Sequence, residues 1–380
     1  MYIKSIKLHN FRNYKKLSVS FSKKINIIYG RNAQGKTNLL ESIYVLGFTK
    51  SHRSFIDNSL ITDNEDYLTI EGVVNDKVDS KYNVYIDSKQ KKLKCNNDFI
   101  KKISDYIALV NVIIFTPDDL EIVKGSPQIR RKYLNLELSQ LYSNYYVILN
   151  EYNKILKMRN DYLKKLNKGI SKDLAYLDTI TNYLIDKLVN ICKIRKKYID
   201  KVNEYCSNIY KDISNLDNFK IIYKPNIDLD YNDSNIKEVL KEEYHKKQNL
   251  DIKLCMTNFG PHKDDYEFYL DNKNLKLYGS QGQQRLAVLA FKLSEIEIIK
   301  KYRESTPILL LDDIFSELDG VKKNNLLKYI SKDIQTIITT TDLNNLDKKL
   351  TSKSKLFRIK DGNIKKIKEV TEDEQWTLWC

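Results

Sequence analysis

One loop near the N-terminus limits what this chain can fold into more than any other feature. It follows the short apolar run Ile25–Tyr29 and precedes a helical pattern at residues 36–46. Its eight residues fit the Walker A pattern GxxxxGK[ST], and they are Gly30, Arg31, Asn32, Ala33, Gln34, Gly35, Lys36 and Thr37. The glycines let successive N–H groups surround a phosphate, while Lys36 reaches the β- and γ-phosphates and Thr37 ligates Mg²⁺. Strand, loop and helix together predict an α/β core that binds a nucleotide and Mg²⁺.

A second part of the same site is predicted near residue 312. Residues 308–311 form a continuous apolar strand, and Asp312 and Asp313 follow it directly, as in a Walker B motif. We expect Asp312 to hold Mg²⁺, directly or through water, and Asp313 to orient and deprotonate the attacking water. Two acidic residues after a strand are common in isolation. Together with the Walker A loop they indicate ATP hydrolysis, with Lys36 and Asp313 as the catalytic residues.

A polar turn precedes the helical run at residues 286–301, and it contains Ser280, Gln281, Gly282 and Gln283. This turn resembles the signature of ABC-type ATPases, which binds the γ-phosphate of a nucleotide held by a second subunit. The N-terminus of a helix, with its free N–H groups, suits such an anion. A polar turn before a helix is also ordinary. The order of the motifs favours the signature, because Walker A, a long insertion, this turn and, about 25 residues later, Walker B follow one another.

The hydrophobic pattern separates an ATPase head from a helical lobe, and the length of the chain suits two structural units. We expect residues 1–125 to form the N-terminal part of the head, residues 126–255 an inserted lobe, and residues 256–380 the C-terminal part of the head with signature and Walker B. A heptad seam predicts the first helical arm of the lobe: Leu134, Leu138, Leu141, Tyr145, Ile148, Tyr152 and Ile155. After a turn at residues 166–173, a second apolar face predicts the second arm. The result is a short antiparallel hairpin of about 50 Å.

The two ends of the chain show β-structure. Leu17, Val19 and Phe21 alternate with polar residues, which is the period of a half-buried strand. Near the other end, Asp361 and Gly362 separate two apolar segments and predict a tight β-hairpin.

The charge balance favours a polyanionic partner. The chain has 65 Lys and Arg against 50 Asp and Glu, a net charge of +15. Such a surface attracts nucleic acid, although a compositionally biased, AT-rich genome would produce a similar excess of lysine. No stretch approaches the roughly 18 apolar residues of a membrane span and no secretory signal is evident, so we expect a cytoplasmic protein without a membrane partner. The five scattered cysteines argue against a disulfide scaffold or a cysteine zinc site.

Six short strings carry a more specific resemblance. They are residues 10–14 (NFRNY), 50–53 (KSHR), 117–120 (PDDL), 123–127 (VKGSP), 130–134 (RRKYL) and 260–265 (GPHKDD). With the motifs above, they make residues 2–340 similar to the RecF family of the SMC-like ABC-type ATPases. Three positions depart from the expected patterns. Asn135 replaces an Asp, Lys263 replaces an Arg, and residues 340–342 (TTD) stand where transporter-type ABC ATPases carry a switch histidine.

The resemblance implies an ABC-type ATPase head, in which a P-loop domain with a mixed sheet and helices carries an inserted helical-hairpin lobe. It implies an ATP-dependent homodimer that binds single-stranded or gapped DNA and acts with RecO and RecR in loading recombinase. The processes implied are recombinational repair, DNA replication and the SOS response, in the cytoplasm at the nucleoid. ATP hydrolysis would then be weak and stimulated by DNA, and it would serve as a switch.

The DNA-contacting residues are left open by the sequence. The basic cluster of Arg130, Arg131 and Lys132 suits DNA phosphate as well as it suits a cap on the helical arm. His52, beside Arg53, suits a contact with nucleotide or DNA and equally a structural role. For His262, in a Gly-Pro turn beside two carboxylates, we expect a conformational or lobe-contact role.

Three other classes of protein are alternatives. An SMC-type structural clamp needs arms of hundreds of residues and a hinge, which a hairpin of about 50 Å does not provide. A transporter-type ABC subunit would need a membrane partner and a switch histidine. A monomeric P-loop kinase or NTPase would leave the signature turn unused. Kinetics distinguish this last class, because the activity of a composite dimeric site rises with the square of protein concentration when the protein is dilute.

Overall fold

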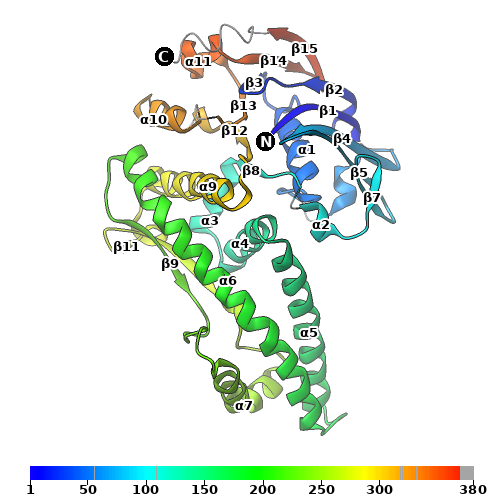
Figure 1. Ribbon diagram of the computed structural model, residues 1–380, viewed down its shortest axis with the longest axis vertical. Coiled ribbons are helices and arrows are strands. Elements are labelled where there is room, and N and C mark those ends of the chain that lie inside the picture. The colour runs from blue at the N-terminus through cyan, green and yellow to red at the C-terminus, as the bar shows by residue number, and fades with distance from the viewer. Residues whose placement is uncertain (55, 108, 317, 319, 331–332, 369–380) are drawn as a thin grey trace. The chain divides into compact units, whose positions relative to one another are not determined.

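The computed structural model of the protein (Figure 1) describes residues 1–54, 56–107, 109–316, 318, 320–330 and 333–368. These residues form two compact units. Unit 1 comprises Met1–Asp119, Asp212–Ser214 and the described residues from Leu289 onward. Unit 2 comprises Leu120–Lys211 and Asn215–Val288.

The boundaries of the units differ from the predicted ones, most clearly on the C-terminal side. The sequence predicts a return to the head after residue 255. In the structure, β10 (Asp265–Leu270) pairs along its length with β9 (Phe219–Lys224) of the lobe. This pairing keeps the chain in unit 2 as far as Val288. The signature turn therefore belongs to the lobe, and not to the head as predicted.

The first sheet of unit 1 has six strands in the order β15-β14-β3-β13-β12-β8. They are β3 (Ile25–Tyr29), β8 (Val112–Phe115), β12 (Ile308–Asp312), β13 (Thr336–Thr340), β14 (Lys355–Lys360) and β15 (Asn363–Lys368). All neighbours in this sheet are parallel except β15, which runs antiparallel to β14. Every residue of β12 and β13 is buried, which explains why the apolar run in β12 is continuous and does not alternate.

The second sheet of unit 1 is antiparallel throughout, in the order β2-β1-β4-β5-β6-β7. Its strands are β1 (Tyr2–Phe11), β2 (Tyr14–Ser20), β4 (Tyr67–Asn75), β5 (Asp79–Asp87), β6 (Lys91–Cys95) and β7 (Asp98–Ile100). Along β4, fully buried residues alternate with more accessible ones. This is the pattern of a sheet with one face on the core.

A buried glutamine joins the two sheets. Gln335, which is 1% exposed, directly precedes β13. Its Oε1 accepts a hydrogen bond from the N–H of Ile3 at 2.7 Å, and its Nε2 donates to the carbonyls of Ile3 at 2.8 Å and Ser22 at 2.7 Å. These bonds satisfy a buried amide and connect β1 to the C-terminal part of the chain.

The helices of unit 1 are α1 (Lys36–Phe48), α2 (Ile103–Ile107), α10 (Gly320–Ile330) and α11 (Lys348–Ser352), and α9 (Gln281–Arg303) enters it at Leu289. Short 3₁₀ turns are η1 (Asp57–Leu60), η2 (Pro117–Leu120), η4 (Ile314–Ser316) and η5 (Leu343–Asn345). The helix α1 contacts strands of both sheets, and most of its side chains are buried. A helix that is apolar on nearly all sides is one that packs in a core.

Unit 2 is mainly helical. Its helices are α3 (Glu121–Lys124), α4 (Pro127–Leu141), α5 (Ser143–Asn167), α6 (Leu174–Ser214, apart from its last turn), α7 (Ile236–Leu254), α8 (Leu275–Tyr278) and the start of α9, with the 3₁₀ turn η3 (Pro261–Lys263). A small sheet, β11-β10-β9, completes it, with β11 at Lys273–Asn274. In Figure 1, α5 and α6 run side by side as the predicted hairpin.

Side-chain contacts establish the antiparallel register of that hairpin. Arg159 Nε donates to Thr181 Oγ1 at 3.0 Å, and Arg195 Nε donates to the Tyr145 hydroxyl at 3.1 Å. Later residues of α5 thus meet earlier residues of α6. With 25 and 41 residues, the two arms are about 38 Å and 60 Å long.

One helical prediction needs correction. The heptad seam predicts one continuous first arm, but the helix breaks at Tyr142, whose φ and ψ of −124° and 102° are extended. The break separates α4 from α5. Across it, the hydroxyl of Tyr145 donates to Oδ1 of Asn135 at 2.7 Å, so a buried polar contact accompanies the bend.

Candidate nucleotide site

The Walker A loop leaves the carboxyl end of β3 and enters α1, which confirms its predicted position between strand and helix. Contacts on both sides require the two glycines. A Cβ at Gly35, where φ is 108°, would lie 2.7 Å from Asn13 Nδ2 and 2.8 Å from the Tyr14 hydroxyl. A Cβ at Gly30 would overlap the carbonyl oxygen of Ile359. The Tyr14 hydroxyl donates to the Gly35 carbonyl at 2.9 Å and holds the loop in place.

The start of α1 offers hydrogen-bond donors to an anion. Gly35 is the N-cap residue and provides no side-chain acceptor to the first turn. N–H groups at such a helix end, together with the helix dipole, favour a phosphate. Arg31, Asn32 and Ala33, at the tip of the loop, are exposed. The loop is therefore accessible to a ligand from one side.

A distant hairpin supports the loop. The N–H of Asp361 donates to Gln34 Oε1 at 2.6 Å, and the N–H of Gly362 donates to the Gln34 carbonyl at 3.2 Å. Both residues of this turn have positive φ, 50° and 66°, as a type I′ turn requires, so the predicted hairpin is confirmed. The sequence predicts the turn itself, but it gives no sign that the turn supports the nucleotide loop.

Lys36 points into its own loop. Its Nζ donates to the carbonyls of Gly30 at 2.6 Å and Arg31 at 2.8 Å. Burial lowers the pKa of the Lys36 ammonium from its usual value, and the negative charges of Asp313 and Asp312 oppose that shift. A buried cation beside free N–H groups is a suitable site for phosphate oxygens.

Asp312, at the end of β12, meets hydroxyls from two other elements. Its Oδ1 accepts hydrogen bonds from Thr37 Oγ1 at 3.1 Å and from Thr339 Oγ1 at 2.6 Å. Burial raises the pKa of the Asp312 carboxyl, and the two hydroxyls and the charges of Arg53 and Lys36 oppose that shift. Among the described residues, no cation lies within 4 Å of this carboxylate. A buried carboxylate beside a hydroxyl is a donor set that fits Mg²⁺.

Asp313 lies immediately beyond the strand, with its backbone in the left-handed region at φ 51°. Its N–H donates to Thr339 Oγ1 at 3.0 Å, so Thr339 contacts both predicted Walker B residues. The Thr340 hydroxyl donates to the carbonyl of Asp342 at 2.9 Å. Glu317 and Asp319, a few residues after Walker B, lie outside the described residues.

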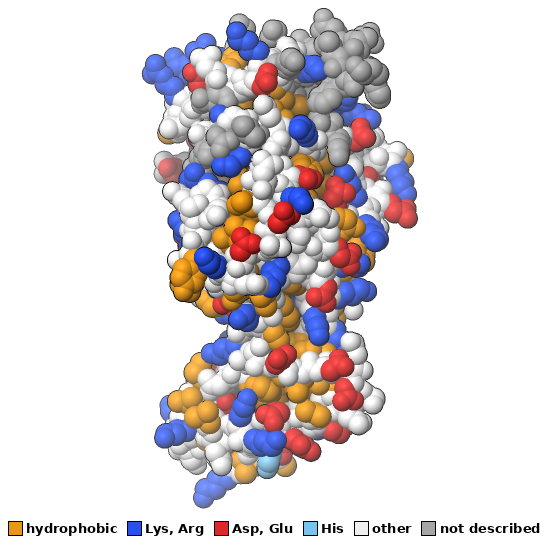
Figure 2. Space-filling model, turned by 90° about the vertical axis from the view of Figure 1, so that its left-hand side faces the viewer, with side chains coloured by type: hydrophobic (Ala, Val, Ile, Leu, Met, Phe, Trp, Pro, Cys, Tyr) orange, Lys and Arg blue, Asp and Glu red, His pale blue; other side chains and the backbone are white. Residues whose placement is uncertain are grey.

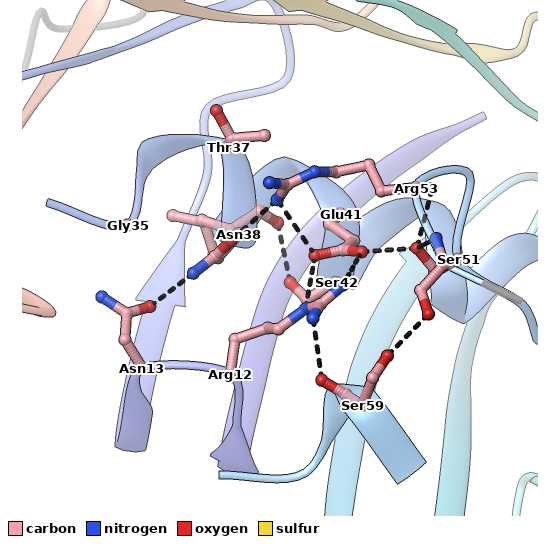
Figure 3. A network of polar contacts seen from close by, with 12 residues as sticks. Arg12, Asn13, Gly35, Thr37, Asn38, Glu41, Ser42, Ser51, Arg53 and Ser59 are labelled. Atoms are coloured by element: carbon pink, nitrogen blue, oxygen red, sulfur yellow. Dashed lines mark hydrogen bonds and ion pairs between the residues drawn. The ribbon is translucent and has the colours of Figure 1, made fainter. Parts of the chain in front are cut away.

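A buried carboxylate on α1 anchors the segments around the loop (Figure 3). Glu41, which is fully buried, accepts two hydrogen bonds from Arg12, at 3.0 and 2.7 Å, and one from Ser51 Oγ at 2.5 Å. Arg53 Nη1 lies 3.6 Å from Glu41 and donates to Asn38 Oδ1 at 3.1 Å. Burial alone would raise the pKa of Glu41, but the hydrogen bonds of Arg12 and Ser51 outweigh it, and the pKa is lowered.

This network, which we call the Glu41 cluster (Arg12, Asn38, Glu41, Ser51 and Arg53), was not predicted from the sequence. Arg12 and Arg53 lie in strings that carry the family resemblance, but the carboxylate between them is part of an unremarkable helical pattern. The cluster ties the β1–β2 turn and the segment after α1 to the helix of the Walker A loop.

His52 is largely buried beside the Glu41 cluster, and its ring packs edge-on against Tyr44 at 5.1 Å. Neither ring nitrogen has a hydrogen-bond partner among the described residues. Burial lowers the pKa of His52 to about 4, so the ring is neutral near pH 7. Packing against Tyr44 favours the structural one of its two predicted roles.

The signature turn forms a capping box at the start of α9. The N–H of Gln283 donates to Ser280 Oγ at 3.2 Å, and the N–H of Ser280 donates to Gln283 Oε1 at 2.8 Å. Ser280, Gln281 and Gly282 are exposed. The two reciprocal bonds explain Ser and Gln at this spacing as a helix cap. They leave the role of Gly282 unexplained.

Two of the family-like strings meet inside unit 2. Arg130 forms a paired hydrogen bond with the carboxylate of Asp265, at 2.6 and 2.8 Å, and Arg131 Nη1 donates to the Asp264 carbonyl at 2.7 Å. The two predicted roles of this basic cluster are contact with DNA phosphate and a cap on the helical arm. These bonds to Asp264 and Asp265 favour a structural role for Arg130 and Arg131. The His262 ring likewise joins two parts of the lobe, with Nδ1 2.6 Å from the Tyr152 hydroxyl and Nε2 2.9 Å from the Thr257 carbonyl.

The departure at Asn135 is accommodated within the same unit. Asn135 Oδ1 accepts from Arg195 Nη2 at 2.9 Å, while Arg195 forms its ion pair with Asp264 at 2.8 Å. The amide oxygen of Asn135 therefore accepts the hydrogen bond that a carboxylate oxygen of the expected Asp would accept. Lys263, the other departure, is exposed.

Charged side chains of both signs mix on one face of the described part of the molecule. On the face that Figure 2 shows, Lys and Arg side chains are interspersed with Asp and Glu side chains. That face therefore does not present a single basic patch. No helix among the described residues has both the length and the apolar character needed to cross a bilayer.

The geometry of the nucleotide site defines a class of protein. A Walker A loop after β3 and an acidic strand end after β12, with β13 between them, form the nucleotide site of a P-loop ATPase. The chain matches the family model described as the RecF/RecN/SMC N-terminal domain over residues 2–365. It is 40% identical over 368 residues to the DNA replication and repair protein RecF of Bacillus cereus strain AH820, covering 96% of this chain and 98% of that protein.

Solved structures agree with the sequence match. The chain superposes with a TM-score of 0.88 and 34% identity on a structure described as the recombination mediator protein RecF with ATP in the RecFOR pathway, covering 97% of this chain and 98% of the other. The chain therefore belongs to the RecF family. An Smc head bound to the C-terminal winged-helix domain of ScpA matches with a TM-score of 0.53 at 17% identity, which shows a shared fold. The predicted ABC-type ATPase head with an inserted helical hairpin is confirmed.

Proposed function

We propose that this protein binds ATP and Mg²⁺ at the Walker A site and uses them to form a homodimer on DNA during recombinational repair and replication. The observation that carries the proposal is the convergence of Lys36, Thr37 and Asp312 at the ends of β3 and β12. The solved RecF described with ATP supports the choice of nucleotide. Relatives named for DNA replication and repair support the process.

Each residue of the site has a proposed part in the reaction. The backbone of the Walker A loop and Lys36 bind and orient the β- and γ-phosphates. Thr37 and Asp312 would hold Mg²⁺, which neutralises charge on the phosphates when it is bound. Asp313 is positioned by Thr339 to orient a water and accept its proton. Hydrolysis by this route is proposed to be slow and stimulated by DNA, so that it resets a switch.

We infer that the signature turn acts on the nucleotide of a second copy. A glycine within a helix lowers the stability of the folded state by about 0.5–1 kcal/mol relative to alanine. Outside its own helix, a Cβ at Gly282 would meet no heavy atom closer than Ser280 Oγ at 4.0 Å. Packing within the chain therefore does not require this glycine. Close approach of a partner's phosphate to the exposed start of α9, where the capping box of Ser280 and Gln283 does not use the N–H groups of Gln281 and Gly282, would require it.

A mixing experiment tests this proposal. Ser280→Arg should bind ATP as the wild type does but remain monomeric and inactive, because the large cation blocks the interface. Lys36→Ala should lose ATP binding. Mixing the two should restore part of the ATPase activity, since one composite site of the mixed dimer is intact. Titration with ATP and light scattering provide the measurements, and Ser234→Arg, at another exposed serine, is the matched control. If Ser280→Arg dimerises with ATP like the control, the composite site is disproved.

For the partners, we propose single-stranded or gapped DNA and the recombination mediators RecO and RecR, with recombinase loading and the SOS response as the setting in the cytoplasm. Relatives of the RecFOR pathway and the net charge of +15 support this. DNA affinity should fall linearly with salt on logarithmic axes, because binding releases counterions from phosphates. An SMC-type clamp is not supported by arms of about 38 and 60 Å. No observation favours a monomeric kinase.

A further inference from the structure

A pocket in the helical lobe, far along the sequence from the Walker motifs, contains buried polar groups that the chain itself does not use. It lies in unit 2 between α5, α6 and α7 and has a volume of about 530 Å³. Pockets that bind small ligands generally have volumes of about 300–1,000 Å³. The residues that line it are Arg159, Asp178, Thr181, Asn182, Tyr244 and Gln248, with a rim of residues 241, 242, 245 and 246 from α7.

Arg159 is the first of the two buried polar residues in the lining. It is 1% exposed, and three of its five N–H groups are used within the lobe. Nε donates to Thr181 at 3.0 Å, and Nη1 donates to Asp251 at 2.8 Å and to Thr257 at 2.7 Å. The two N–H groups of Nη2 have no hydrogen-bond partner among the described residues. Nη2 is not among the fully buried atoms without a partner, so water or a ligand can accept from these two donors.

Asp251 already accepts three hydrogen bonds, and none of them comes from Nη2. Its Oδ2 is bound to Arg159 Nη1, and its Oδ1 accepts from the N–H of Asn258 at 3.1 Å and from Asn258 Nδ2 at 3.3 Å. The ring of Tyr244 covers the face of the guanidinium, with its centroid 5.1 Å from Cζ. Arg159 also lines the pocket, from which a ligand can reach its unused donors.

Gln248 is the second buried polar residue. It is 7% exposed and lies one helical turn after Tyr244 on α7, on the face that lines the pocket. Its amide has no hydrogen-bond partner among the described residues. The pocket thus presents two donors from Arg159 and an amide from Gln248 beside the apolar ring of Tyr244. The rim residues Lys241 and Lys246 add positive charge, against the two lining carboxylates of Asp178 and Glu242.

We propose that this pocket binds a carboxylate carried on an apolar group. The charged guanidinium favours an ionised acceptor over a neutral one, because charge-assisted hydrogen bonds are about twice as strong. One carboxylate oxygen would accept from Nη2 of Arg159 and the other from the amide of Gln248. The apolar part of the ligand would cover the Tyr244 ring. Such a carboxylate can come from an acidic side chain of a partner protein or from a free small acid.

Binding of two carboxylate probes to the full-length protein tests the proposal. The first is 4-methylpentanoate, with 4-methylpentanamide as its uncharged counterpart. The second is the blocked peptide acetyl-Leu-Glu-Leu-amide, with the corresponding Gln peptide as its counterpart. We expect saturation-transfer NMR titration to show that a carboxylate probe binds the protein with about tenfold higher affinity than its uncharged counterpart. Binding of the peptide alone assigns the carboxylate to a protein partner, and binding of both probes assigns it to small acids as well.

Variants on α7 separate ligand binding from folding. Gln248→Leu should weaken carboxylate binding about fivefold to tenfold, while Asn249→Leu, which replaces the neighbouring exposed amide, should leave it unchanged. Circular dichroism and ATP binding should be normal in both. The proposal is overturned if neither probe binds at millimolar concentration, if the uncharged probes bind equally well, or if Gln248→Leu binds like the wild type. Those results would mean that the pocket holds only water.

Discussion

The hydroxyl of Thr37 donates a hydrogen bond to Oδ1 of Asp312 at 3.1 Å, although the two residues are 275 positions apart in the chain. The same oxygen accepts a shorter bond, 2.6 Å, from Thr339. A metal ion bound by Thr37 and Asp312 would use the Asp312 lone pair that now accepts the Thr37 hydroxyl hydrogen, so the bond between the two residues would be replaced. Thr339 does not compete for the ion and would continue to hold the carboxylate in position.

Thr339→Val should therefore weaken both the fold and the metal site. Loss of a buried hydroxyl that contacts Asp312 and Asp313 should lower the free energy of unfolding by about 1–3 kcal/mol. The Mg²⁺ concentration needed for ATP binding should rise about tenfold. Thr339→Ser keeps the hydroxyl and should have the stability and the Mg²⁺ requirement of the wild type. Thr336→Val, in the same strand but outside the site, should reduce stability without changing the Mg²⁺ requirement. If Thr339→Val and the wild type need the same Mg²⁺ concentration, Thr339 does not position Asp312 for the metal ion.

Asp313→Asn should separate ATP binding from hydrolysis. The amide has the shape of the carboxylate but cannot accept a proton from water, so the ATPase rate should fall about 10²- to 10⁴-fold. Affinity for ATP should stay within about twofold of the wild type. Single-turnover assays with radiolabelled ATP measure the rate, and equilibrium titration measures the affinity. A wild-type rate in this variant would place the base elsewhere.

Glu41→Gln should destabilise unit 1 through the Glu41 cluster. The change leaves the guanidinium of Arg12 beside a neutral amide, and breaking a buried pair costs about 3–5 kcal/mol. The pKa of Glu41 is lowered in the folded state, so its contribution is present above the unfolded pKa of 4.5 and is lost as pH falls through the folded value. Urea unfolding at pH 7 and pH 4 should thus differ more for the wild type than for Glu41→Gln. Glu65→Gln, at an exposed position, is the control.

His52 should make stability depend on pH in a defined window. Its pKa is lowered from 6.5 to about 4 by burial, so below pH 6.5 the unfolded chain binds a proton that the folded chain does not. Stability from this group is complete above pH 6.5 and decreases towards pH 4, by at most about 3 kcal/mol. His52→Phe keeps a ring against Tyr44 and should remove that decrease. A decrease of the same size in His52→Phe would mean that other groups cause it.

The parts of the site that follow one another in sequence could be predicted, because their geometry is local. Strand, glycine loop and helix around Lys36 form one continuous segment. The two arms of the lobe are predicted by the helical spacing of their apolar residues. Contacts between distant segments could not be predicted. The hydrogen bond between Gln34 and Asp361 joins residues 327 positions apart, and no periodic pattern in the sequence predicts it. Glu41 occupies an ordinary helix position, and only the fold brings Arg12 and Ser51 to it.

The misplaced domain boundary has the same physical origin. Residues 256–288 contain no helical seam that would assign them to the lobe, and their membership is set by the pairing of β10 with β9 across the intervening helix α7. Similarly, the seam continues through Tyr142 with unchanged spacing, while the backbone bends there. A hydrophobic repeat reports which side chains share a face, but it does not report whether the helix beneath them is continuous.

The hydrogen bonds between Ile3 and Gln335 join residues that are 332 positions apart, and this separation has a consequence for biosynthesis. At about 5–20 residues per second, a ribosome needs roughly 15–70 s to add the glutamine after the strand it will hold. The strand β3 also remains unpaired for a long time, because both of its neighbours, β13 and β14, are synthesised after all of unit 2. The long stretches of unit 2 are complete before that. A nascent chain therefore carries unpaired strand edges, which are prone to pair with other chains, and the strand before its phosphate loop is paired only after β13 and β14 have emerged.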